Sequence, residues 1–189
     1  QKITNTILYV GRIVPEKGLH ILLTSLKYIK HSLNLEIIGP SGWNLDYYQN
    51  MLRLIDIENR RGKHKIMYLG RLDPNQTSLI DRYQKASIFV LPSFYEAFGL
   101  VLLEAMSCKT AVVSTNTGGT PEIIKDGVNG LLVPVNDPIK LAEAINYLLE
   151  NKDVIIKLGE AGRETVTNNF SKEAVVKKLC RIYEKMLNA

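Results

Sequence analysis

Two cationic side chains, Arg12 and Lys17, follow an apolar run and could together bind phosphate oxygens. A guanidinium offers a planar fork of donors and an ammonium a point charge, so the pair suits an anion with several oxygens. Gly11, directly before Arg12, would let the backbone turn and approach a ligand closely. The same two cations also fit a pair of solvated surface charges. Neither common glycine-rich phosphate motif, G-x-G-x-x-G or G-x-x-x-x-G-K-[ST], occurs in the chain.

A second anion-binding element is indicated between Leu91 and Met106, where Gly99 precedes a strongly helix-forming run. Backbone N–H groups at a helix N-terminus are unpaired and carry the positive end of the helix dipole. Glycine at this point leaves no side chain to block a ligand. We therefore expect a diphosphate to face the backbone N–H groups of four consecutive residues: Phe98, Gly99, Leu100 and Val101.

Two carboxylates, Glu96 and Glu104, lie eight positions apart in the same segment. On one continuous helix they would be about 12 Å apart, farther than the roughly 5–9.5 Å that separates hydrolytic carboxylate pairs. Beside a diphosphate they would repel it unless they faced hydroxyl groups, which a sugar nucleotide supplies on its ribose and its sugar. The alternative is that Glu96 helps to start the helix and Glu104 is a surface residue. The apolar residues around Glu104 argue against a fully solvated side chain.

Six short, nearly continuous apolar runs alternate with amphipathic stretches, which predicts an α/β domain with a Rossmann-like open parallel sheet and helices on both faces. Such sheets bind ligands at the carboxyl ends of their strands. Asp137-Pro138 and Thr120-Pro121 are both expected to be a helix N-cap followed by proline at the first helical position. The predicted strands are Thr6–Val10, Leu35–Ile38, Lys65–Leu69, Ser87–Leu91, Thr110–Ser114 and Gly130–Val133.

The end of the chain has two helical patterns, 153–168 and 171–187, without a strand between them. We expect residues 153–189 to form a helical appendage to a single domain that covers 1–189. An apolar stripe at helical spacing occupies the last pattern, at Val175, Leu179, Ile182 and Met186.

The overall composition favours an anionic ligand, because the net charge is +5 and the isoelectric point about 9.1. No apolar run is long enough for a membrane span and no secretion signal opens the sequence, so a cytoplasmic location is expected. Cys108 and Cys180 are expected to be reduced core thiols. The chain has no Asp-x-Asp motif and its histidines are scattered, so we predict no metal. The dispersed Lys and Arg residues do not indicate a nucleic-acid partner.

Five motifs in order resemble glycosyltransferase family 4, and the similarity covers nearly the whole chain. They are G-R-x-x-x-x-K-G from Gly11, I-G at Ile38, L-G-R at Leu69, the segment from Leu91 to Met106, and G-G-x-P-E-I-I from Gly118. The resemblance implies one lobe of a GT-B fold, the C-terminal lobe that binds the sugar donor. The expected reaction is transfer, with retention of configuration, from a UDP-, GDP- or ADP-linked sugar to an acceptor hydroxyl, without a metal or other cofactor.

The resemblance also implies roles for the candidate residues. Arg12 and Lys17 would bind the leaving diphosphate, Glu96 the hydroxyls of the transferred sugar, and Glu104 the ribose. The remaining donor-binding positions would be the backbone near the phosphates and sugar, two residues beside the nucleobase, and the glycine of a loop in the same cleft: Gly11, Phe98, Gly99, Leu100, Val101, Arg71, Leu72 and Gly39. The loop Gly39-Pro40-Ser41-Gly42 departs from the family pattern, which puts its role in doubt.

The family's acceptor-binding N-terminal lobe has no counterpart in this sequence, so we expect these residues alone to bind nucleotide weakly and to transfer sugar poorly or not at all. Three alternatives stay open. The first is an epimerase-type enzyme with a related fold. The second is a non-catalytic module that binds sugar nucleotides. The third is a protein whose basic charge brings it to an anionic membrane surface, as a peripheral contact at the inner face.

Overall fold

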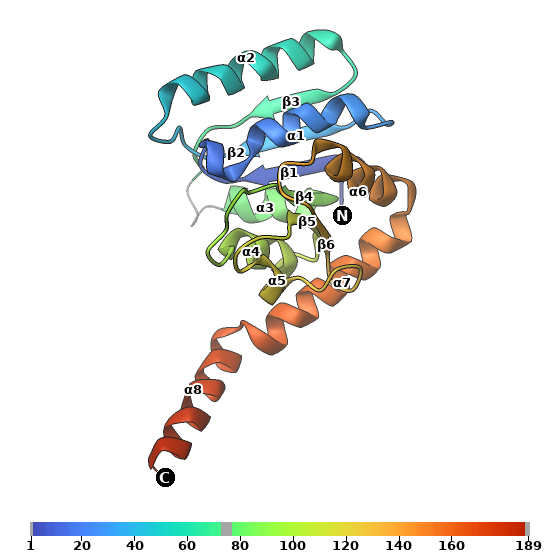
Figure 1. Cartoon of the computed structure of the whole chain (residues 1–189). Coiled ribbons are helices and arrows are strands. Elements are labelled where there is room, and N and C mark those ends of the chain that lie inside the picture. Colours follow the sequence, from blue (N-terminus) through green and yellow to red (C-terminus); the bar gives the residue numbers. More distant parts are fainter. Residues whose placement is uncertain (1, 73–76, 188–189) are drawn as a thin grey trace.

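The computed structural model describes residues 2–72 and 77–187, and its centre is one six-stranded sheet (Figure 1). All strand pairs are parallel, and the spatial order is β3-β2-β1-β4-β5-β6. The six predicted runs all form strands, and no end moves by more than one residue. The strands are β1 (Thr6–Val10), β2 (Asn34–Ile38), β3 (Lys65–Tyr68), β4 (Ile88–Leu91), β5 (Ala111–Thr115) and β6 (Leu131–Val133).

Both faces of the sheet are covered by helices, which explains why the strands are mostly apolar, with Glu36 of β2 as a buried exception. Side chains alternate along each strand, so Ile7 and Tyr9 of β1 belong to one core cluster and Leu8 and Val10 to the other. The first face is covered by α1 (Leu19–Ser25), α2 (Leu45–Arg61) and α6 (Pro138–Glu150). The second is covered by α3 (Thr77–Lys85), α4 (Leu100–Ser107) and α5 (Thr120–Ile123). The predicted Rossmann-like class is confirmed.

One of the two predicted proline-containing helix starts is correct and the other is wrong. Asp137 caps α6, since its side chain accepts from the backbone N–H groups of Ile139 and Lys140. In α5, however, Thr120 is the first helical residue and Gly119 is the N-cap, without a side-chain hydrogen bond. The hydroxyl of Thr120 instead points back into the preceding loop, where it lies 2.6 Å from the carbonyl oxygen of Thr115. Because the Thr120 hydroxyl donates to this carbonyl oxygen, it does not cap α5.

The two C-terminal helices differ in how far they join the domain. α7 (Lys152–Asn169) packs against α4, α6 and β5, whereas α8 (Lys172–Leu187) extends beyond the rest of the domain (Figure 1). No residue of α8 is buried, and its predicted apolar stripe is exposed, from 42% at Val175 to 70% at Met186. Cys180 is exposed for the same reason and Cys108 is only partly buried, so the expectation of two core thiols is wrong. Among the described residues, no helix is both long and apolar enough to span a bilayer.

The strand order reverses between β1 and β4, which are neighbours in the sheet but far apart in the chain. Loops that leave these two strands run to opposite sides, so a crevice opens at their carboxyl ends. Both candidate phosphate-binding segments begin here. Residues 11–18 follow β1, and residues 92–99 follow β4.

Candidate functional site

A cavity of about 370 Å³ lies at this reversal point and brings together eight of the twelve predicted site residues. Arg12 and Lys17 line it from the β1 side, and Glu96 from the β4 side. The four predicted residues that do not line it are Gly39, Arg71, Leu72 and Glu104. The complete lining is Val10, Gly11, Arg12, Lys17, Leu91, Glu96, Ala97, Phe98, Gly99, Leu100 and Val101.

An ion pair in the cavity joins two of the predicted ligand-binding groups to each other. Lys17 Nζ lies 2.5 Å from Glu96 Oε2, and both side chains are largely shielded, with exposed fractions of 21% and 11%. Arg12 is exposed, and no carboxylate within residues 2–72 and 77–187 forms an ion pair with it. Of the two cations that line the cavity, Arg12 is therefore unpaired. Lys17 is neutralised as long as Glu96 remains bound to it.

A buried tyrosine supports the backbone that carries the two cations. Tyr9 is fully buried on β1, and its hydroxyl donates to the carbonyl oxygen of Arg12 at 3.3 Å, with the carbonyl oxygen of Lys17 at 3.5 Å. Burial raises the pKa of this phenol well above 10, and the nearby Tyr47 and Glu96 add to the effect. The hydroxyl therefore stays protonated. Tyr9 was not among the predicted site residues, although a phenol within a mostly apolar run was a usable signal.

The loop that carries Glu96 is held at several points along its backbone. The N–H of Phe94 donates to the carbonyl oxygen of Glu16 at 2.8 Å, which joins this loop to the one after β1. On the other side, the N–H of Gly119 donates to the carbonyl oxygen of Glu96 at 2.8 Å, and the hydroxyl of Thr117 donates to that of Phe94 at 3.0 Å. The backbone position of Glu96 is thus determined by loops from two other strands.

Gly118 is required by this contact. Its φ is 52°, and a Cβ atom built on it would lie 2.0 Å from the carbonyl oxygen of Glu96. Only glycine tolerates both the left-handed backbone and so close an approach. The Gly118-Gly119-Thr120-Pro121 motif, whose function the sequence left undefined, is therefore a support for Glu96.

The N-terminus of α4 faces the cavity with unpaired backbone donors. The helix begins at Leu100, and its N-cap, Gly99, has a φ of 93° and no side-chain cap. Its first backbone bond comes from the N–H of Leu102, which donates to the carbonyl oxygen of Gly99 at 2.9 Å. Among the described residues, no carbonyl accepts from the N–H groups of Phe98 to Val101. These donors and the helix dipole suit an anion.

The two glutamates do not share a helix, because Glu96 lies in the loop before α4 and only Glu104 is helical. Glu104 is an exposed residue. It is not fully solvated, as its apolar neighbours indicated, since Tyr83 Oη donates to its Oε2 at 2.7 Å. Leu100, four residues earlier, lies on the same side of α4 and lines the cavity. Glu104 is therefore about 6 Å farther along the helix from the cavity's edge.

The remaining three predicted residues do not line the cavity, but Gly39 contacts Gly11, which does. A Cβ atom on Gly39 would lie 1.9 Å from the carbonyl oxygen of Gly11, so the loop after β2 packs directly against the backbone of Gly11. The N–H of Gly39 also donates to the carbonyl oxygen of Gly70 at 2.8 Å, which ties it to the segment that holds Arg71 and Leu72. Arg71 is exposed, whereas Leu72 packs against the core cluster beneath α3 and α4.

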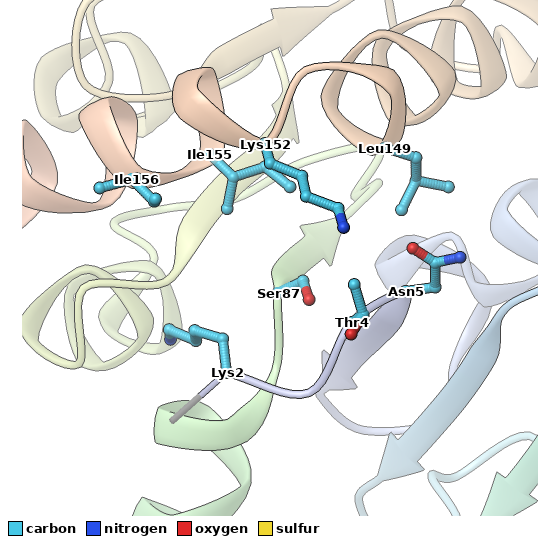
Figure 2. Close-up of a pocket in the computed structure, with 8 residues that line it drawn as sticks. All are labelled: Lys2, Thr4, Asn5, Ser87, Leu149, Lys152, Ile155 and Ile156. Carbon is cyan, nitrogen blue, oxygen red and sulfur yellow. The ribbon is translucent and has the colours of Figure 1, made fainter.

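A second cavity, of about 400 Å³, lies at the opposite end of the sheet, where β1 and β4 begin (Figure 2). Figure 2 shows Leu149 and Ile155 from α6 and α7 on one side, with the Lys152 ammonium extending across the opening. Its lining is Lys2, Thr4, Asn5, Ser87, Leu149, Lys152, Ile155 and Ile156. None of these eight is a carboxylate or a predicted site residue. Although this cavity is similar in volume, the chemistry favours the one at the carboxyl ends.

Sequence comparison gives a family match over most of the chain. A family model described as glycosyl transferases group 1 matches residues 1–165. An uncharacterised glycosyltransferase of Methanocaldococcus jannaschii is 36% identical over 182 residues, which cover 95% of this chain and 48% of the relative. A D-inositol 3-phosphate glycosyltransferase of Corynebacterium glutamicum is 33% identical over 188 residues, covering 95% of this chain and 43% of the relative. The chain spans about half the length of the curated relatives it matches.

Structural comparison agrees at the level of the fold. The Anabaena protein HepE, solved in complex with UDP and glucose, matches with a TM-score of 0.83 and 23% identity. The match covers 98% of this chain and 49% of that one. The predicted fold, one Rossmann-like lobe of the GT-B type, is thereby confirmed.

Proposed function

Because the chain belongs to the group 1 glycosyltransferase family, we propose that it is the donor-binding half of a retaining enzyme. That enzyme would transfer a sugar from a nucleoside diphosphate to an acceptor hydroxyl. One observation carries the proposal: Arg12, Lys17 and the uncapped N-terminus of α4 line a single cavity at the carboxyl ends of the strands. All three attract anions, and they meet where an open parallel sheet binds its ligands.

The leaving group explains why such a cavity needs positive charge. When the bond between the sugar and the diphosphate breaks, its electron pair stays on the diphosphate. Donors that are already oriented toward this group stabilise the transition state without reorganising. Charged hydrogen bonds contribute about 1.5–3 kcal/mol each, so Arg12, Lys17 and the α4 N–H groups could together replace a divalent cation. We accordingly propose metal-independent transfer.

The Lys17–Glu96 ion pair would exchange partners when the donor binds. The diphosphate takes over the ammonium of Lys17, and the sugar hydroxyls take over the carboxylate of Glu96. Both groups then stay paired at each stage, which avoids an uncompensated charge in a shielded position. Glu104 would bind the ribose hydroxyls beyond Leu100, and the segment at Arg71 and Leu72 would border the base.

The acceptor is expected to bind outside this chain, since the chain is about half as long as its relatives. In the proposal, an N-terminal lobe of the same protein supplies the acceptor site. The 189 residues alone would then bind a nucleoside diphosphate but transfer sugar poorly. Efficient transfer by this chain in isolation would contradict that division of labour.

Calorimetric titration tests the proposal directly. UDP is the first ligand, because the fold neighbour HepE was solved with it, followed by GDP and ADP. Arg12→Gln and Lys17→Gln should each weaken the best ligand by roughly 10- to 100-fold, as expected for loss of one charged hydrogen bond. Lys27→Gln, an exposed lysine away from the cavity, should leave affinity unchanged. EDTA should also have no effect.

Two results would contradict the proposal. If none of the three diphosphates binds, the cavity is not a nucleotide site. If Lys27→Gln weakens binding as much as Arg12→Gln does, the attraction is a general effect of the net charge.

A further inference from the structure

Glu104 is the one predicted donor-binding carboxylate that a buried group holds from outside the cavity. Tyr83, on α3, donates its hydroxyl to Glu104 Oε2 at 2.7 Å. The two residues come from neighbouring helices on the same face of the sheet. Tyr83 lies outside all five sequence motifs and was not among the predicted site residues.

Tyr83 is a rigid donor. Its side chain is 2% exposed, and its ring lies 5.7 Å from that of Phe89, centroid to centroid, at 53°. Its carbonyl oxygen accepts from the hydroxyl of Thr110 and from Lys2 Nζ, so the backbone is held as well. Burial raises the pKa of the phenol far above its usual value, and the Glu104 carboxylate raises it further. The hydroxyl is therefore protonated at neutral pH.

Glu104, by contrast, is exposed and would otherwise sample several rotamers. The phenol engages only Oε2. Within residues 2–72 and 77–187, no other hydrogen bond reaches this carboxylate, so Oε1 can accept from a ligand. A side chain that is already held in place loses less entropy when it binds, and its geometry is more selective.

The position along α4 suits a ribose. A diphosphate at the helix N-terminus meets the unpaired N–H groups between Phe98 and Val101. Glu104 lies one helical turn beyond Leu100, about 6 Å along the axis. A nucleoside that extends from the diphosphate over this turn would bring its sugar hydroxyls to the carboxylate.

We propose that Tyr83 is a positioning residue that holds Glu104 for the ribose hydroxyls and thereby sets the preference for ribonucleotides. This inference rests on the proposed function, in which Glu104 binds the ribose. Tyr83 acts only through Glu104. Its loss should therefore weaken ligands that have ribose hydroxyls and leave ligands without them unaffected.

The test compares the dissociation constants of UDP and 2′,3′-dideoxy-UDP, with GDP and its dideoxy form measured in parallel. In the wild type, the better-bound of UDP and GDP should bind at least about tenfold more tightly than its own dideoxy form, as expected for one charged hydrogen bond. Glu104→Ala should reduce this ratio to about one. Tyr83→Phe retains the ring that packs on Phe89 but loses the hydrogen bond to Glu104. The ratio should fall to about threefold, because the carboxylate still accepts from the ribose but is no longer held in place. Tyr147→Phe, on exposed α6 surface, is the matched control and should keep the wild-type ratio.

The double variant Tyr83→Phe/Glu104→Ala should behave as Glu104→Ala alone, because both changes act on one interaction. If Tyr83→Phe keeps the full wild-type ratio, the positioning role is overturned while the proposed function stands. The same holds if it weakens both ligands equally, since that would be a purely structural effect. A wild-type ratio near one would instead refute ribose binding by Glu104. Diphosphate binding would still be judged separately by Arg12→Gln and Lys17→Gln.

Discussion

At the scale of single residues, the candidate site is defined by how its charged side chains pair with one another. Lys17 and Glu96 were assigned to different parts of a ligand, yet they contact each other at 2.5 Å. Their pairing keeps a lysine and a glutamate stable in a shielded cavity, where an unpaired charge would be costly. It also means that any anion must compete with Glu96 for Lys17. Arg12 carries no such competition, so it is the group that a diphosphate would meet first.

Removal of the Glu96 carboxylate should therefore have opposite effects on binding and on turnover. Glu96→Gln frees Lys17, and nucleoside diphosphate affinity should rise about two- to fivefold, in line with the ~0.5–1 kcal/mol of a modest ion pair. In the intact enzyme, turnover should fall on the order of 10²-fold, because a hydrogen bond to the reacting sugar is weakened. Calorimetry and initial rates measure the two effects.

Glu16→Gln is the matched control for this change, since Glu16 is an exposed carboxylate on the neighbouring loop. It should alter neither quantity. Loss of diphosphate affinity in Glu96→Gln would show that Glu96 supports the diphosphate site and does not compete with it.

At the scale of elements, the site depends on loops that support one another. The loop after β5 holds the loop after β4, which in turn bonds to the loop after β1. Gly118 makes a close approach between the loops after β5 and β4, since a Cβ atom on it would lie 2.0 Å from the carbonyl oxygen of Glu96. The motif at Gly118 thus controls where the Glu96 carboxylate, a predicted donor ligand, lies.

Substitution of Gly118 should affect both stability and binding. Gly118→Ala places a methyl group 2.0 Å from the Glu96 carbonyl oxygen at a φ of 52°. Gly127→Ala is the control, because Gly127 has a similar φ of 71° but open space around it. We expect Gly127→Ala to cost about 1–2 kcal/mol for the left-handed backbone alone. Gly118→Ala should cost roughly 1–3 kcal/mol more for the steric overlap.

Urea unfolding measures both costs, and calorimetry measures nucleotide affinity. Only Gly118→Ala should weaken diphosphate binding, since only it displaces the loop that carries the unpaired N–H groups of Phe98 and Gly99. Equal destabilisation by the two changes would mean that the Gly118 contact is not a constraint.

At the scale of the whole molecule, the described residues form one six-stranded sheet domain with one helix, α8, outside it. α7 closes the domain against α4 and β5, whereas α8 leaves it and buries none of its residues. α8 is amphipathic, and its apolar stripe from Val175 to Met186 is exposed. Attraction to an anionic membrane and a cytoplasmic location stay predictions from composition, and vesicle sedimentation would test the first.

Deletion of residues 172–189 should leave the stability of the domain almost unchanged. No side chain of α8 (Lys172–Leu187) is buried, so the melting temperature should move by less than about 2 °C. Deletion from residue 152 onward is the contrasting control. It removes Leu158, which is 1% exposed, and should unfold the domain. A drop of more than about 5 °C on removal of α8 alone would show that α8 stabilises the domain despite its exposure. Calorimetric melting curves measure both.

What the sequence determined by itself was local and periodic. Nearly continuous apolar runs predicted all six strands, because strands that are buried on both faces show little polar alternation. The β-α alternation predicted a parallel sheet that binds ligands at the carboxyl ends of its strands. Gly11, Arg12, Lys17, Glu96 and the Gly99 helix start were selected correctly as neighbours in space, since all of them follow β1 or β4. Only the tertiary structure decided the contacts between separate segments. The Lys17–Glu96 pair, the hold of Tyr83 on Glu104 and the support of Glu96 by Gly118 join residues 79, 21 and 22 positions apart. Side-chain orientation and packing between elements determine such pairs, and neither leaves a periodic trace in the chain.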